Sequence, residues 1–183
     1  NSPEFLLKHD NINVYTDVTT KDYDGLNIVL LPWINDENQE DVEEYLSTVN
    51  APIVMSHLEV NGGMMMPGHY HGGGTPIEWF KRFEQVYSGH FHHKSTIGNV
   101  RYLGSQMEFT WSDFGDEKYF HILDTDTREI TQVKNPLKMF HKVFYDDSKE
   151  TLMSIKKKDF SSLKNTFVCL LYTSDAADDW SSG

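Results

Sequence analysis

The chain has 183 residues, a formal net charge of −12 and 38% hydrophobic residues, so it suits one domain or part of a larger protein. Its single cysteine excludes a disulfide framework and a cysteine-based zinc site. No run approaches the ~20 apolar residues that span a bilayer, and we expect no membrane partner. Nine histidines in this acidic chain instead favour a site where imidazole and carboxylate groups bind Mn, Fe or Zn.

The N-terminal quarter predicts an alternation of strands and a helix. Residues 1–10 resemble the end of a helix, and residues 12–15 predict a short strand. A turn is expected at residues 22–25, where Asp and Gly residues cluster. Residues 26–31 form a compact apolar run that favours a buried strand, whereas residues 38–49 predict a helix with acidic residues in its first turn.

The alternation continues to about residue 90. Residues 52–55 predict a second buried strand, which is followed by a loop rich in Gly and Met at residues 60–74. Residues 76–83 predict a short helix with Pro in its first turn. Residues 84–87 predict a third strand, so the first half of the chain reads as strand and helix in turn.

The pattern changes to consecutive strands in the second half. Four segments are expected to form strands, namely residues 99–104, 118–123, 128–133 and 139–144. Residues 124–127 predict a hairpin turn between the second and third of these. We therefore expect a mixed α/β (α+β) fold of two packed sheets, a β-sandwich with helices outside.

Histidines follow two of the predicted buried strands. His57 comes directly after the strand at residues 52–55, and His90 and His92 follow the strand at residues 84–87. The carboxyl ends of such strands are where open α/β sheets hold ligands. Two residues apart in extended chain, His90 and His92 would lie ~6–7 Å apart, which suits two metal ions ~3.5–4 Å apart better than a single ion.

The remaining histidines have less specific interpretations. His93 is expected to face solvent, away from its neighbours. His69 and His71 lie in the Gly-Met loop, where a mobile surface position is favoured over a substrate contact. His121 and His141 fall inside alternating strand patterns and are interpreted as structural.

Four stretches of the chain resemble the calcineurin-like metallophosphoesterases. They are residues 54–62, residues 87–92 with their Gly-His-Phe-His motif, residues 99–104 and residues 120–127. The segment at 99–104 makes the chain more similar to the SbcD-type nuclease subunits than to the phosphatases of this family. The nearest resemblance is to the recombination endonuclease subunit of T-even-like tailed phages, and it runs from about Asn1 to about Tyr145.

The resemblance implies a two-metal centre, most readily with Mn. His57 and His90 would bind one ion and His92 the other. The earlier family motifs, which are Asp-X-His, Gly-Asp-X-X-Asp and Gly-Asn-His, are not found in this sequence. We therefore expect an N-terminally truncated fragment that starts just after them. Without the bridging aspartate, the three imidazoles would hold at most one ion weakly, so the fragment is expected to be inactive.

The resemblance also implies the function and partners of the parent protein. It would be an endo- or exonuclease that hydrolyses DNA phosphodiesters in recombination and repair, paired with an SMC-like ATPase subunit and able to form a homodimer. It would act in the cytoplasm, or in the host cytoplasm if it is encoded by a phage. Two alternatives stay open: a small-molecule phosphoesterase, and a non-catalytic module that binds metal or serves as a scaffold.

Three segments are expected along the chain. Residues 1–147 would be the C-terminal part of the phosphoesterase domain, and residues 148–168 the start of a following segment. Residues 169–183 resemble the in-frame translation of a transposase-type sequencing adaptor, and we expect this stretch to be non-native.

Overall fold

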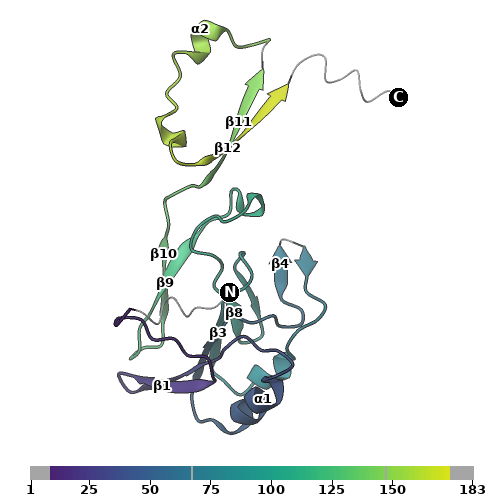
Figure 1. The fold of residues 1–183 in the computed structure, drawn as a ribbon, viewed down its shortest axis with the longest axis vertical. Helices are drawn as coiled ribbons and strands as arrows, with labels where there is room; N and C mark the ends of the chain where they lie inside the picture. Colours follow the sequence, from purple (N-terminus) through teal and green to yellow (C-terminus); the bar gives the residue numbers. More distant parts are fainter. Residues whose placement is uncertain (1–8, 67, 147, 174–183) are drawn as a thin grey trace, which may run out of the picture. The chain divides into compact units, whose positions relative to one another are not determined.

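The computed structural model describes residues 9–66, 68–146 and 148–173, which belong to two compact units (Figure 1). The first unit is Asn1–Ser105 with Tyr119–Lys134, and the second is Gln106–Lys118 with Asn135–Gly183. The expected segment boundaries after residues 147 and 168 stay predictions. Of the stretch expected to be non-native, residues 174–183 lie outside the described residues.

The first unit is built on a six-stranded sheet with the order β1-β2-β3-β6-β8-β7. Its central strands β2, β3, β6 and β8 are parallel, and the outer strands β1 and β7 pair antiparallel with their neighbours. The strands are β1 Thr19–Tyr23, β2 Leu26–Leu30, β3 Ile53–Ser56, β6 Gln85–Ser88, β7 Ser95–Ile97 and β8 Val100–Tyr102. The expected mixed α/β class is therefore confirmed.

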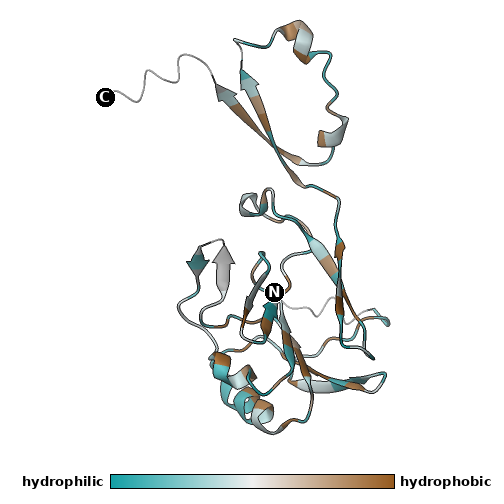
Figure 2. Cartoon of the chain, turned by 180° about the vertical axis from the view of Figure 1, so that it is seen from behind, coloured by the Kyte–Doolittle hydropathy of each residue, from teal (hydrophilic) through white to brown (hydrophobic). Residues whose placement is uncertain are grey.

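One face of this sheet is covered by α1 (Gln39–Thr48) and the short 3-10 helix η2 (Ile77–Phe80). Val54 of β3 and Val86 of β6 point to this face and form a buried cluster with Leu46 of α1 and Phe80 of η2. The outer face of α1 is hydrophilic, and the helix accordingly carries both hydrophilic and hydrophobic colours in Figure 2. The apolar side chains of α1 recur at helical spacing and form one face, and burial of this face holds the helix against the sheet.

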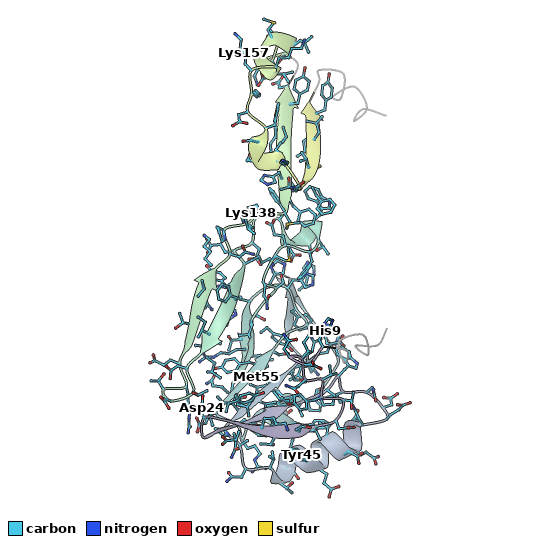
Figure 3. The ribbon with its side chains drawn as sticks, turned by 60° about the vertical axis from the view of Figure 1, so that its left-hand side comes forward. His9, Asp24, Tyr45, Met55, Lys138 and Lys157 are labelled. Carbon is cyan, nitrogen blue, oxygen red and sulfur yellow. The ribbon has the colours of Figure 1, made fainter. Side chains whose placement is uncertain are left out.

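The opposite face carries the alternate side chains of the same strands. Ile53 of β3 and Tyr87 of β6 are buried there, and Ile130 of the hairpin β9 (Tyr119–Leu123) and β10 (Ile130–Lys134) packs against them. Met55, labelled in Figure 3, is a partly buried member of the same group. Of the central strands, β2, β3 and β6 are thus covered on both faces, as the apolar runs of β2 and β3 predict, whereas Arg101 of β8 is exposed.

Several local expectations differ from the structure. The strand expected at residues 12–15 is absent, and the unexpected strand β1 instead pairs with β2 through the turn that carries Asp24, labelled in Figure 3. The expected helix at 76–83 is only the four residues of η2. The Gly-Met loop contains two short paired strands, β4 (Met64–Met66) and β5 (His69–Tyr70). Residues 1–8 of the expected N-terminal helix lie outside the described residues.

The second unit contains a two-stranded parallel sheet of β11 (Phe140–Asp146) and β12 (Phe167–Thr173). Its short helices are η3 (Trp111–Asp113), α2 (Leu152–Ile155) and η4 (Ser161–Leu163). Lys157, labelled in Figure 3, follows α2. Within the described parts of both units, no helix combines the length and the apolar character needed to cross a bilayer.

Candidate metal-binding site

The parallel strands β2, β3 and β6 end at the same edge of the first unit's sheet. Backbone hydrogen bonds keep the chain in register just past these ends: Leu31 N–H donates to the carbonyl of Met55, and Gly89 N–H donates to that of Ser56. Each strand is followed within a few residues by an aromatic or imidazole side chain at this edge, and these side chains are Trp33, His57 and His90.

The structure brings His57 and His90 into direct contact. His57 Nε2 and His90 Nδ1 lie 3.3 Å apart, and the two rings meet edge to face. Two nitrogen ligands of one tetrahedral ion, each about 2.0–2.1 Å from the metal, are separated by about 3.3–3.4 Å. The separation of the two ring nitrogens therefore matches the spacing that a shared ion would require.

Burial, reinforced by the neighbouring His90, lowers the pKa of His57, although Glu59 acts in the opposite direction. The His57 ring is consequently neutral near pH 7, which is the form that binds metals.

A carboxylate that sequence reasoning did not single out completes the cluster. Glu59 Oε1 lies 3.0 Å from His90 Nε2, and its Oε2 lies 3.5 Å from His71 Nε2. A carboxylate on one imidazole nitrogen fixes the tautomer and leaves the other nitrogen free for a metal. Glu59 thus lies on the side of the His90 ring opposite the nitrogen that faces His57. The spacing of His57 and Glu59, two residues apart after a strand, was the available signal for this residue.

The backbone at residues 89 and 90 is shaped by the close approach of His57. A Cβ on Gly89 would lie 2.8 Å from His57 Nδ1, so no other residue fits without a shift. His90 adopts a φ of 85°, in the left-handed region that non-glycine residues rarely occupy. Such a conformation costs about 1–3 kcal/mol and tends to persist at functional sites. The strain is what turns the His90 ring back toward His57.

The next two histidines occupy different environments. His92 is half-buried, and its backbone carbonyl accepts a hydrogen bond from the Ser105 N–H at 3.0 Å. His93 is buried, so the expectation that it faces solvent is wrong. Strand alternation does not extend past Ser88, because the chain turns at Gly89 and His90.

Across the described residues, no three or more His, Cys, Asp or Glu side chains form a group that could hold a metal ion.

The remaining histidines lie in different environments. His71, expected in a mobile surface loop, contacts Glu59, whereas His69 is exposed. His121 lies in β9 and its ring is partly buried, with burial and the nearby Lys94 lowering its pKa.

A cavity of about 420 Å³ adjoins the cluster in the first unit. His57 and Glu59 form part of its wall, which continues through Trp33 and the loop that leads into α1. Trp79 of η2 closes the opposite side. The candidate metal site therefore has a space beside it that is large enough for a small ligand.

Comparison with known proteins gives two informative relatives, and no protein-family model matches the chain. The chain is 34% identical over 162 residues to exonuclease subunit 1 of Enterobacteria phage T4, a match that covers 88% of this chain and 46% of that protein. It is 24% identical over 130 residues to the SbcD subunit of nuclease SbcCD from Staphylococcus saprophyticus, covering 64% of this chain and 35% of that protein. The chain thus spans less than half the length of either relative. These matches confirm the resemblance carried by the motifs: the chain is related by sequence to the SbcD-type nuclease subunits and to their phage counterpart.

Proposed function

We propose that the chain is part of the catalytic domain of a metal-dependent DNA nuclease subunit, in which His57 and His90 bind a divalent cation, Mn²⁺ most readily. The observation that carries this proposal is the 3.3 Å separation of their facing ring nitrogens at the carboxyl edge of the sheet. The nuclease names of both relatives support the same reading.

Each residue of the cluster has a distinct part in this proposal. His57 supplies a neutral imidazole because burial lowers its pKa. Glu59 orients His90 through the 3.0 Å contact of its Oε1 with His90 Nε2, and Gly89 allows the two rings to meet. His92 would contribute to a second ion. A bound divalent cation would polarise a phosphoryl oxygen of the substrate.

The same cluster supports the proposal that the chain alone is inactive. Two adjacent divalent cations need bridging and neutralising carboxylates, and Glu59 is already engaged with His90 and His71. We propose that one ion binds weakly and that phosphodiester turnover requires carboxylates from outside these residues. For the whole protein we propose a DNA substrate, an SMC-like ATPase partner and a location in the cytoplasm, which is the host cytoplasm if the protein is encoded by a phage.

The test measures Mn²⁺ binding by electron paramagnetic resonance. We expect His57→Ala and His90→Ala each to weaken Mn²⁺ binding by at least about tenfold, because each removes one of two ligands. The matched control is His9→Ala, an exposed histidine that precedes the strands of the sheet, which should leave binding unchanged. Equal Mn²⁺ affinity in wild type and both site variants would contradict the proposal. Robust hydrolysis of bis(p-nitrophenyl) phosphate by the wild-type chain would contradict its inactivity.

A further inference from the structure

The cavity beside the histidine pair has an aromatic side chain at its mouth. The Trp33 ring centroid lies 5.8 Å from that of His57 and 5.4 Å from that of His90, yet 45% of the residue is exposed. Its position, against the pair but facing solvent, is that of a platform for a flat ligand.

The loop that carries Trp33 is held by its own hydrogen bonds. Asn38 donates from Nδ2 to the Trp33 carbonyl at 2.9 Å and accepts at Oδ1 from the Asn35 N–H at 2.9 Å. Asn35 in turn accepts at Oδ1 from the N–H groups of Glu37 and Asn38. Two further lining residues are also tied together, because Thr75 N–H donates to the Glu59 carbonyl at 2.7 Å. A site ordered before binding loses little entropy on binding.

The lining of the cavity selects a class of ligand. Trp33 and Trp79 provide aromatic surface, and Asn35, Gln39 and Thr75 add amide and hydroxyl groups. Among the lining residues there is no Lys or Arg, whereas Asp36 and Glu59 are acidic. A phosphate would be repelled by this lining, but a neutral planar ring with donors and acceptors at its edge is matched by it.

We propose that this cavity binds a nucleobase of a single-stranded DNA segment, with Trp33 as the stacking platform, while the adjoining phosphodiester lies at the His57–His90 pair. The proposal rests on the proposed function for the identity of the substrate. It adds a base-binding site that the metal cluster does not require. One sugar-phosphate link would join the base in the cavity to the phosphodiester at the histidine pair, because the Trp33 ring lies against the imidazole rings of His57 and His90.

The test compares two probes of equal charge on the full chain with Mn²⁺. One is fluorescein-labelled dT6, and the other is a six-unit abasic oligomer with the same phosphates, each titrated by fluorescence anisotropy. We expect dT6 to bind at least about tenfold tighter, because stacking of a base on an aromatic side chain contributes that much. Trp33→Leu and Trp79→Leu should abolish the difference, whereas Trp33→Phe should retain most of it. The control Trp111→Leu, in the second unit, should leave it unchanged.

The outcomes separate the cavity from the metal site. Equal affinity for the two probes, or no binding of either, would overturn the base-binding inference. So would a preference for dT6 that survives Trp33→Leu and Trp79→Leu, because the base would then bind elsewhere. Mn²⁺ affinity is measured on the same samples: unchanged Mn²⁺ binding in His57→Ala and His90→Ala would reject the proposed function whatever the oligonucleotides do. Circular dichroism confirms that each variant is folded.

Discussion

At the scale of single residues, the site depends on the absence of a side chain at position 89. A Cβ at position 89 would lie 2.8 Å from His57 Nδ1, so the geometry of the His57–His90 pair requires glycine at this position. His90, with its φ of 85°, depends on the same turn. The most specific feature of the site is therefore a backbone property, which metal-ligand spacing alone does not reveal.

Gly89→Ala tests this dependence. The added methyl group must displace the His57 ring, so we expect the free energy of unfolding to fall by about 1–3 kcal/mol, as in other overpacked sites. Mn²⁺ affinity should fall with it. The matched control is Gly72→Ala, where a Cβ would meet nothing within 4 Å, and it should change stability by less than about 0.5 kcal/mol. Urea unfolding provides the measurement, and a neutral Gly89→Ala would contradict the close approach.

At the scale of elements, β3 is the strand that delivers His57 to the edge of the sheet. It pairs parallel with β2 on one side and β6 on the other, and its Ile53 is fully buried between the sheet and the hairpin β9–β10. The position of His57 is thus a consequence of how well this strand is packed.

Replacing Ile53 by Ala measures that packing. The cavity left by a fully buried Ile should lower the free energy of unfolding by about 2–5 kcal/mol. Ile122→Ala is the matched control, because Ile122 is 53% exposed on β9 and its loss should cost less than about 0.5 kcal/mol. The unfolding free energies of the two variants are measured by chemical denaturation monitored by circular dichroism. Equal losses of stability in Ile53→Ala and Ile122→Ala would show that β3 is not a buried strand.

In the second unit, a buried ion pair ties the segment around η3 together. Lys118 Nζ lies 3.0 Å from Asp113 Oδ1, with both side chains almost fully buried. Burial raises the pKa of Asp113, but the N–H of Thr110, the Lys118 ammonium and the N–H of Phe109 outweigh it, so the pKa is held well below its usual range. Since the folded-state pKa is depressed, the stabilisation is complete above the unfolded-state pKa of about 3.9 and is lost progressively as the pH falls below it.

Lys118→Met removes the cation and leaves the Asp113 carboxylate buried. We expect a loss of about 3–5 kcal/mol at pH 7 in the second unit, measured by hydrogen exchange of β11 amides. The gap between wild type and variant should narrow below about pH 4, because protonation of Asp113 removes the charge that Lys118 compensates. The control is Lys81→Met, whose ion pair with Glu78 is two-thirds exposed and screened by solvent, so that its loss should change stability little. A gap that does not change with pH would contradict this account.

At the scale of the whole molecule, the two units differ in how well they cover their apolar residues. The first unit buries two clusters on opposite faces of its sheet. In the second unit, the two-stranded sheet and α2 leave large apolar side chains open, with Phe144 of β11 72% exposed and Leu152 of α2 69% exposed. A parallel sheet is normally covered on both faces, so such a surface favours association.

Self-association is therefore expected of the isolated chain, and it should be concentration-dependent in sedimentation velocity. The double variant Phe144→Ser with Leu152→Ser should lower the weight-average sedimentation coefficient at a given concentration. Phe120→Ser, a comparably apolar but 46% exposed position on β9 of the first unit, is the control and should change it little. A monomeric wild-type chain at high concentration would refute the expectation.

The sequence alone was enough to locate the strands that build the site. The strands predicted at residues 26–31, 52–55 and 84–87 match β2, β3 and β6 within one residue at each end. The first two are apolar runs with β-branched residues, because burial on both faces of a sheet favours such residues. The placement of His57 and His90 just past two strand ends followed from this. Their motifs also indicated the relationship to SbcD-type nuclease subunits that the comparisons show.

Only the tertiary structure decided which side chains meet beyond those strand ends. Glu59 and Trp33 reach the histidine pair from the loops after β3 and β2, which the parallel register of β2, β3 and β6 brings together, and His71 contacts Glu59 from the segment after β5. The burial of His93 likewise followed from the turn at Gly89 and could not be read from strand alternation. Periodicity reports whether a segment is buried, but contacts between loops depend on long-range register, which leaves no local pattern in the sequence.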